Sequence, residues 1–338
     1  MKSTLRDVSI VIVTYKGDEL TKNCLDSLSL TCGTEPQIVV VDNSPSETTR
    51  NMVAAYPNAV YVSSPGNPGF AGGNNRAIPE CDRPYILLLN NDTIVHTRES
   101  IDRLVEFLDE HPNCGAAQGT MDIPTPQGKL MGACGSFLTP LGFLYAPHAF
   151  EKKPPKDIGA YKCFAAIGAF MIFRRKILQQ TGGAPFRTHF WAYYEEIDFC
   201  HRIWLSGSEV WYVPTPPIDH LCGQTAGQFK HADIMGRYLR NQLFSLSVNL
   251  NFWNRLRMVP ALKCIILGYG ALHLLRGDMA MFRASVRAIF TTRHDRARIT
   301  AARRQIKRLR KVSDRAIMHT FVRFPPLNYI LRSLKAGA

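Results

Sequence analysis

The sequence predicts an α/β fold in which a mostly parallel sheet is flanked by helices and followed by a helical, basic extension. Short apolar runs without alternation are typical of strands buried on both faces, as in parallel sheets. Segments with the apolar spacing of helices alternate with these runs in the first part of the chain. Lysine and arginine gather instead in the last quarter. We therefore expect a folded domain at residues 1–240 and an extension at residues 241–338.

The first 95 residues contain four apolar runs separated by helical segments. Strands are expected at residues 8–13, 37–41, 59–63 and 85–89, and helices at residues 19–30 and 48–56. A strand–helix–strand alternation favours parallel pairing with right-handed crossovers. Residues 1–95 are thus predicted to form a nucleotide-binding half-domain.

The second half of the domain, residues 96–240, is predicted to carry the acceptor and catalytic groups. Its expected elements are helices at 100–110 and 196–205, strands at 116–119 and 209–214, and a strand over the sheet at 164–173. Residues 120–160 are rich in Gly and Pro and lack periodicity. A loop of this length is usually functional or disordered, so we expect a partly mobile insertion over the active site.

Charge and cysteine content narrow the class of protein. The formal net charge is +14, and residues 276–338 hold sixteen Lys or Arg against three Asp. The nine cysteines are scattered and form no CxxC pair, which indicates buried thiols in a reducing cytosol rather than a zinc site. No apolar signal region precedes the first strand, so we expect a cytoplasmic protein.

Asp92 is the first candidate functional residue, because it follows the apolar strand at 85–89 directly. Ligands of open α/β sheets lie beyond the carboxyl ends of the strands. Together with Asn90 and Asn91, the Asp92 carboxylate offers oxygen ligands to Mg²⁺ or Mn²⁺, and through the metal to a diphosphate. The alternative is an Asx turn that caps the helix beginning near Thr97.

Two further stretches fit a nucleotide site. Asp42 follows the strand at 37–41 and can accept hydrogen bonds from a base or ribose, although it can also be an ordinary turn aspartate. Residues 66–77 are rich in glycine, which allows a close backbone approach to a ligand. They match neither a Walker loop nor the GxGxxG fingerprint, and a flexible loop is the alternative.

The segment at residues 189–202 is the most specific in the chain. Glu195, Glu196 and Asp198 fall within four positions at a predicted helix start, where acids also interact favourably with the helix dipole. Trp191 and Tyr194 stand before them, and aromatic faces stack on sugar rings. We expect a carboxylate here to take a proton from an acceptor hydroxyl. Helix capping is the alternative.

His220 is a second candidate metal ligand. It follows the strand at 209–214, and an imidazole beyond a strand end could return to the metal. A satisfied structural histidine is the alternative.

Taken together, these residues resemble the family 2 glycosyltransferases of the GT-A fold, particularly the bacterial rhamnosyltransferase-like members, over roughly residues 7–245. The matching motifs are residues 8–15, 41–44, 66–75, 87–92 and 194–202, with His220 last. Two positions depart from the family pattern. Asn90 stands where Asp-x-Asp has its first carboxylate, and Glu196 stands where Glu-Asp has its aspartate.

The resemblance implies an inverting sugar transfer from a nucleotide-diphosphate sugar, dTDP-rhamnose or a UDP-sugar, to a lipid-linked or cell-surface glycan. It implies that the donor contacts Thr14, Tyr15, Asp42, Asn67, Gly73 and Asn74. It also implies that Asp92 and His220 bind the divalent metal and that Glu196 is the base, a role that Asp198 could share. A non-catalytic sugar-nucleotide or glycan-binding protein is the alternative.

The extension has the character of a membrane-binding element. Residues 258–275 are apolar and about the minimum length to span a bilayer, but Pro260 and Lys263 favour an interfacial or buried helix. The following residues alternate basic and apolar, which predicts binding to an anionic membrane surface. No nucleic-acid motif accompanies them, so we expect no nucleic-acid partner. We expect a peripheral protein on the inner face of the cell membrane.

Overall fold

The structure is a computed structural model that describes residues 2–152, 158–222, 229–326 and 329. The strands are β1 (Val8–Thr14), β2 (Gln37–Asp42), β3 (Ala59–Ser63), β4 (Tyr85–Asn90), β5 (Thr93–Ile94), β6 (Cys114–Gln118), β7 (Met121–Thr125), β8 (Gly128–Met131), β9 (Phe137–Leu138), β10 (Leu144–Tyr145), β11 (Tyr161–Lys162), β12 (Phe170–Arg174), β13 (Glu209–Tyr212) and β14 (Ile218–His220). The α-helices are α1 (Asp18–Cys32), α2 (Glu47–Ala54), α3 (Gly69–Ala77), α4 (Glu99–Glu110), α5 (Ile177–Thr181), α6 (Glu195–Leu205), α7 (His231–Asn249), α8 (Phe252–Leu275), α9 (Met279–His294), α10 (Arg296–Leu309) and α11 (Asp314–Phe321).

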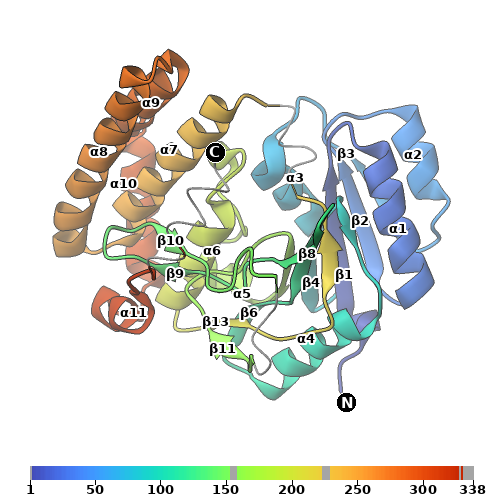
Figure 1. Cartoon of the computed structure of the whole chain (residues 1–338). Helices are drawn as coiled ribbons and strands as arrows, with labels where there is room; N and C mark the ends of the chain where they lie inside the picture. Colours follow the sequence, from blue (N-terminus) through green and yellow to red (C-terminus); the bar gives the residue numbers. More distant parts are fainter. Residues whose placement is uncertain (1, 153–157, 223–228, 327–328, 330–338) are drawn as a thin grey trace.

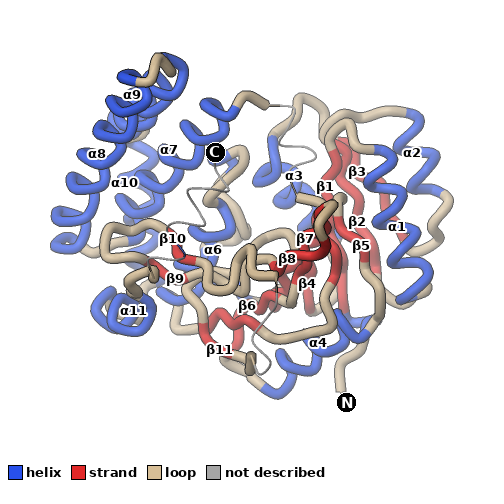
Figure 2. Tube along the Cα trace, in the orientation of Figure 1, coloured by secondary structure: helices blue, strands red, loops and turns tan. Residues whose placement is uncertain are grey.

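Eight strands form the main sheet, in the order β11-β13-β6-β12-β4-β1-β2-β3. β1, β2, β3 and β4 run parallel, and β12 runs antiparallel between β4 and β6. The expectation of a strand lying over the sheet at 164–173 is therefore wrong, because the strand begins at Phe170 and lies within the sheet. In Figures 1 and 2 the sheet lies between α1 and α2 on one side of the view and α7–α10 on the other.

Both faces of the parallel strands are buried, which explains why their sequences lack alternation. Val11 packs into one core together with Leu88, whereas its neighbours Ile10 and Ile12 pack into the core on the opposite face. All four side chains are fully buried. Side chains on both faces of such a strand must therefore be apolar.

The insertion and the glycine-rich stretch are more regular than the sequence indicates. The described part of residues 120–160 contains β7, β8, β9 and β10, while residues 153–157 lie outside the described residues. The glycine-rich stretch forms α3 rather than a loop. A second sheet, in the order β5-β14-β7-β8, lies beside the carboxyl end of β4. It brings β14 next to the residues that follow β4.

The basic extension packs on the domain that precedes it. Ile306, Ile317 and Phe321 belong to the same core as the sheet residue Val11. The backbone amide of Asn251 donates a 2.6 Å hydrogen bond to Asp314. The expected boundary at 240/241 falls inside α7. The extension thus completes the main core, because α10 and α11 cover part of it.

Candidate active site

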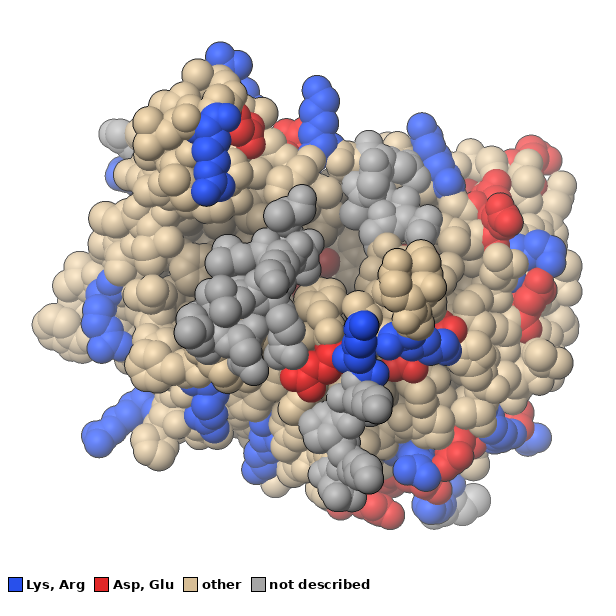
Figure 3. Space-filling view, in the orientation of Figure 1, with Lys and Arg blue, Asp and Glu red and all other residues tan. Residues whose placement is uncertain are grey.

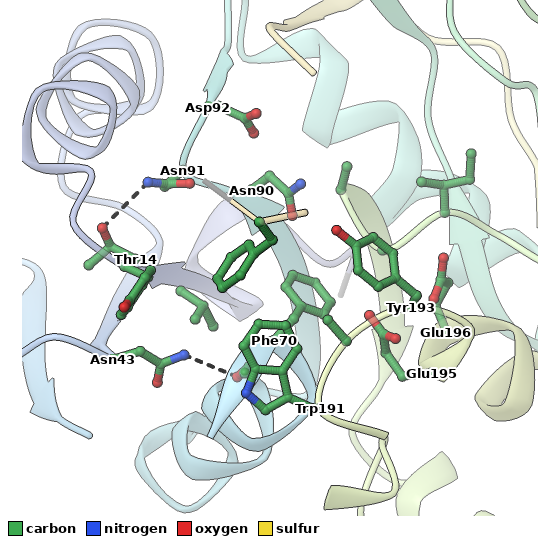
Figure 4. A pocket seen from close by; sticks show the side chains of 18 of the residues that line it. Thr14, Asn43, Phe70, Asn90, Asn91, Asp92, Trp191, Tyr193, Glu195 and Glu196 are labelled. Atoms are coloured by element: carbon green, nitrogen blue, oxygen red, sulfur yellow. Dashed lines mark hydrogen bonds between the residues drawn. The ribbon is translucent and has the colours of Figure 1, made fainter. Parts of the chain in front are cut away.

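A cavity of about 310 Å³ lies at the carboxyl ends of β1 and β4 (Figure 4). Ten of the fifteen residues predicted for the site line it, namely Thr14, Tyr15, Asn67, Asn90, Asn91, Asp92, Trp191, Glu195, Glu196 and His220. They come from strands, loops and a helix that are far apart in sequence. The topology therefore gathers most of the predicted nucleotide, metal and acid residues in one place.

One wall of the cavity carries Asp92 and His220. The carboxylate of Asp92 is only 6% exposed, and its Oδ1 lies 3.3 Å from Nε2 of His220. The Asn90 amide nitrogen is also 3.3 Å from this imidazole nitrogen. Burial alone would lower the pKa of His220, but contacts with Asp92 and Cys222 raise it to about 9. The pair is thus held together by charge.

This wall fits a divalent cation that is bound partly by its substrate. Among the described residues, Oδ1 of Asn90 is buried without a hydrogen-bond partner, and Oδ1 of Asp92 is buried with only the His220 imidazole beside it. No group of three His, Cys, Asp or Glu side chains there could enclose a metal unaided. Mg²⁺ commonly takes one or two carboxylates together with substrate phosphates. Asp92, Asn90 and His220 are the residues that would supply the protein's share of such a site.

The opposite wall carries Glu195 and Glu196 from the first turn of α6 (Figure 4). Among the described residues, one buried carboxyl oxygen of each glutamate has no hydrogen-bond partner. Burial raises the pKa of Glu196 to about 7. Burial, and then the charge of Glu196, raise the pKa of Glu195 still further. A carboxyl group that titrates near neutral pH is suited to exchange a proton with a substrate.

A strained segment presents these glutamates to the cavity. Trp191, Tyr193 and Tyr194 have φ angles of 64°, 71° and 72°, which non-glycine residues seldom adopt. The side-chain nitrogen of Asn241 in α7 lies within 3.0 Å of the carbonyl oxygens of Phe190, Ala192 and Tyr193. These contacts from α7 offset the strain and fix the start of α6.

Aromatic side chains close one side of the cavity. The indole of Trp191 donates a 2.9 Å hydrogen bond to the carbonyl of Asn67, and Arg237 lies 4.3 Å from its ring. Phe229 lies edge-on to Trp191 and stacked with Tyr15, with ring centroids 5.2 and 6.3 Å apart. The sequence analysis missed Phe229, because a single aromatic residue in a loop carries no pattern.

Gly69 makes the contact between α3 and this segment possible. Its φ is +76°, and a Cβ atom there would lie 2.3 Å from the carbonyl oxygen of Trp191. Gly73 lies outside the cavity, and a Cβ there would meet Val13 at 2.7 Å. The glycines of α3 therefore serve close packing against β1 and Trp191.

Two further residues predicted to bind the donor lie beneath the cavity wall. Asp42 is fully buried and accepts hydrogen bonds from the backbone amides of Ser44 and Ser46 and from the Tyr61 hydroxyl. The Asn74 amide donates to the Phe70 carbonyl inside α3. The structure therefore gives Asp42 a place in the turn after β2 and gives Asn74 a place within the helix.

Asp198 lies outside the cavity. Its Oδ2 lies 3.0 Å from Arg187 Nε and 2.9 Å from Arg202 Nε, while Oδ1 accepts hydrogen bonds from Ser245 and Asn249. Burial alone would raise the pKa of Asp198, but the two guanidinium groups and the two hydrogen bonds hold it well below its usual range. The expectation that Asp198 shares the role of base is corrected, because both oxygens are engaged in structural contacts. The i,i+4 spacing of Asp198 and Arg202 is a signal from which this pair could have been predicted, but the sequence analysis did not use it.

Tyr194, predicted to contact the acceptor, is also placed in the core. Its ring is 2% exposed and packs edge-on against Tyr238 of α7, with centroids 5.4 Å apart. The neighbouring Tyr193 lines the cavity in its place. Positive φ angles at both residues turn Tyr193 outward and Tyr194 inward, which sequence periodicity does not reveal.

Comparison with curated proteins finds relatives that act in glycan assembly. Residues 9–182 match the model of glycosyl transferase family 2. The low-salt glycan biosynthesis hexosyltransferase Agl10 of Haloferax volcanii is 27% identical over 303 residues, which cover 80% of this chain and 92% of the relative. The N-acetylglucosaminyl-diphospho-decaprenol L-rhamnosyltransferase of Mycobacterium tuberculosis is 22% identical over 269 residues, which cover 72% and 85%.

Solved structures share the fold. The crystal structure of GalNAc-T7 with UDP, GalNAc and Mn²⁺ superposes with a TM-score of 0.54 at 14% identity, over 71% of this chain and 47% of that one. The crystal structure of TarS of S. aureus gives a TM-score of 0.52 at 15% identity, over 79% and 43%. This chain thus spans about half the length of these solved chains. The expected GT-A-type α/β fold is confirmed, and the chain belongs to glycosyl transferase family 2 and is a rhamnosyltransferase-like glycosyltransferase.

Proposed function

We propose that this glycosyltransferase moves a sugar, with inversion at the anomeric carbon, from a nucleotide-diphosphate sugar to a hydroxyl of a lipid-linked or cell-surface glycan. The observation that carries the proposal is the placement of Asp92 and Glu196 on opposite walls of one cavity. A diphosphate bound at the first wall leaves the sugar facing the second. The reacting carbon would then lie between the leaving group and the base.

Asp92, with His220 and Asn90, would hold a divalent cation, Mg²⁺ or Mn²⁺. When bound, the cation supplies charge neutralisation for the departing diphosphate. The protein's own contribution at this wall is orientation, because the Asn91 amide donates to Thr21 of α1 at 3.2 Å and to Thr14 of β1 at 3.4 Å. These bonds fix the turn that presents Asp92.

Glu196 would accept the proton of the attacking hydroxyl. Its raised pKa of about 7 keeps it able both to accept and to release a proton near neutral pH. Glu195 would stay protonated beside it, since burial and the charge of Glu196 raise the pKa of Glu195 well above its usual range. Trp191 and Tyr193 would contact the face of the acceptor sugar, as aromatic rings commonly do.

We propose dTDP-rhamnose or a UDP-sugar as the donor, and the names of the relatives support transfer of rhamnose or another hexose and an acceptor carried on a lipid. One relative is named as a hexosyltransferase of glycan biosynthesis, and another as a rhamnosyltransferase that acts on a diphospho-decaprenol acceptor. A lipid-linked acceptor requires access to a membrane. We propose that the chain works peripherally on the cytoplasmic face of the cell membrane.

The test is release of nucleoside diphosphate across a panel of donors, with Mg²⁺ or Mn²⁺ and a cell-envelope lipid extract as the acceptor source. Glu196→Gln is expected to abolish turnover while donor binding persists, and Glu195→Gln is the matched control that keeps most of it. Full turnover in Glu196→Gln would remove Glu196 as the base. Donor binding without turnover in the unmodified protein, with every donor and extract, would favour the alternative of a binding protein.

A further inference from the structure

Helix α8 exposes an apolar stripe along its whole length. The residues of this stripe recur every three or four positions and are all exposed: Trp253, Leu256, Pro260, Cys264, Leu267, Ala271 and Leu274. The opposite face, with Met258, Leu262 and Ile266, is buried against α7 and α9. Among the described residues, α8 is the one helix long and apolar enough to cross a membrane, and only 28% of its most apolar window is buried.

The amino end of the stripe carries its largest side chains. Phe252 is 55% exposed and Trp253 is 74% exposed, and their ring centroids lie 5.1 Å apart. Leu256, one turn later, is 57% exposed. Exposed side chains of this size are unfavourable in water when they adjoin one another. Tryptophan is enriched where a protein meets the headgroup layer of a bilayer.

A cationic groove lies on one side of this amino end. It has a volume of about 370 Å³, between the end of α7, the start of α8 and the outer face of α10. Its cations are Arg303, Arg304, Lys307 and Arg310, of which Arg310 forms an ion pair with the buried Asp314, and Phe252 forms part of the same wall. No aspartate or glutamate among the described residues lines this groove. It therefore offers several cations to an anion beside an apolar side chain.

A second cationic groove lies on the other side of the amino end of α8. It has a volume of about 580 Å³ and lies between α8 and α11. Arg257, Arg315 and His319 line it together with Met258 and Met318, and no acid in the described part of the chain does. In Figure 3 the flank of the molecule over α8 is largely uncharged, with basic side chains at its borders. The apolar stripe is thus bordered by positive charge.

We propose that α8 lies in the headgroup layer of an anionic phospholipid bilayer, with the stripe toward the acyl chains and the two grooves holding lipid phosphates. The inference deepens the proposed peripheral function and rests on it. A bilayer is the occupant that matches both halves of the surface, because it offers apolar chains beneath a layer of phosphates. A nucleic acid would leave the stripe in water. A second copy of the chain would place its own cationic grooves against these, and the like charges would repel.

The test measures co-sedimentation of the full chain with vesicles of phosphatidylglycerol and phosphatidylcholine, compared with phosphatidylcholine alone. Trp253→Ser/Leu256→Ser removes apolar area, and Arg303→Glu/Arg304→Glu reverses one groove. Since each basic residue near such a surface strengthens binding about fivefold, the charge reversal should weaken binding roughly twentyfold or more. We expect the apolar variant to lose binding by at least about tenfold.

Matched controls lie on the opposite flank of the molecule. Leu30→Ser changes a side chain that is 88% exposed on α1, and Arg6→Glu/Arg50→Glu imposes the same change of charge near the amino terminus and on α2. Both should bind vesicles as the unmodified chain does. All variants change exposed residues, so their melting temperatures should agree within a few degrees.

Two results would overturn the proposal that α8 and the two grooves bind a bilayer. One is normal vesicle binding by both α8-region variants. The other is binding to a single-stranded oligonucleotide that exceeds vesicle binding and persists in Trp253→Ser/Leu256→Ser. Donor binding without vesicles is read in parallel and should be unchanged in every variant. Failure of the docking surface is thereby separated from failure of the active-site proposal, which Glu196→Gln tests alone.

Discussion

Nε2 of His220 lies 3.3 Å from Oδ1 of Asp92 because β14 pairs with β5, the short strand that follows Asp92. The pairing sets His220 opposite Thr93 and aims its ring at the end of β4. The ligand expected from sequence is thus placed by a two-residue strand rather than by a long element.

Replacing His220 with Asn should weaken use of the metal. If His220 is one of three protein ligands, as proposed, its loss removes a donor that the substrate does not supply, so the Mn²⁺ concentration at half-maximal turnover should rise about tenfold or more. Nucleoside diphosphate release across a Mn²⁺ titration measures this. His231→Asn, at an exposed position at the start of α7, is the matched control and should leave the titration unchanged. An unchanged titration in His220→Asn would exclude it as a ligand.

The pH dependence of turnover should report Glu196. Since the base must be ionised, kcat/KM should rise with pH through a midpoint of about 7. Burial and the charge of Glu196 raise the pKa of Glu195 well above its usual range, so we expect Glu195 to be neutral, and the uncharged amide of the variant Glu195→Gln reproduces that state. The rising limb should therefore stay near pH 7 in Glu195→Gln. A midpoint that falls to about 4.5 would show instead that Glu195 is ionised first.

The same burial makes Glu196 a source of instability at alkaline pH. Its folded-state pKa of about 7 exceeds the ordinary value of 4.5, so the folded protein binds more protons and stability falls as pH rises from 4.5 to 7. Glu196→Gln removes this loss. It should be more stable than the unmodified protein by about 3 kcal/mol at pH 8 and nearly equal at pH 4. Urea unfolding at both pH values measures the difference, which should not reverse sign.

Asp198→Asn should unfold the protein far more readily while leaving the cavity residues in place. Removing a buried carboxylate leaves Arg187 and Arg202 without their partner, at a cost of about 3–5 kcal/mol. Asp26→Asn, which breaks an exposed pair with Lys22, should cost about 0.5 kcal/mol or less. Any activity that remains in Asp198→Asn should keep the pH midpoint of about 7. A shifted midpoint would instead place Asp198 in the proton transfer.

Gly69 and Gly66 form a matched pair for the contact with Trp191. Both have positive φ, but a Cβ at Gly66 meets nothing within 4 Å, whereas one at Gly69 meets the Trp191 backbone. Gly66→Ala should cost about 1 kcal/mol through backbone strain alone. Gly69→Ala should cost roughly 2–4 kcal/mol and raise the acceptor KM, since Trp191 must move. Equal effects of the two variants would show that the contact has no role.

The sequence predicted the structure best where every residue of an element is buried. β1, β2 and β4 are buried on both faces, so unbroken apolar runs marked them, and the polar residues after β4 marked the cavity. It was least informative where a partner distant in sequence decides. α3 is a helix that contains glycines, because its backbone approaches β1 and Trp191 too closely for larger side chains. The sequence alone made this stretch look like a loop. In the sequence Asp198 looks like a third acid beside Glu195 and Glu196. Only the structure shows that Arg187 forms an ion pair with it.

Asn241 has a consequence for how the molecule would work on a lipid surface. It fastens the loop in front of the two glutamates to α7, and α7 packs directly on the helix proposed to lie among the headgroups. α7 would then hold the active site at a fixed position relative to the bilayer. The glutamates would stand at a constant height above the lipid, so the reach of the acceptor from its anchor, rather than any sugar contact alone, would decide which hydroxyl is modified.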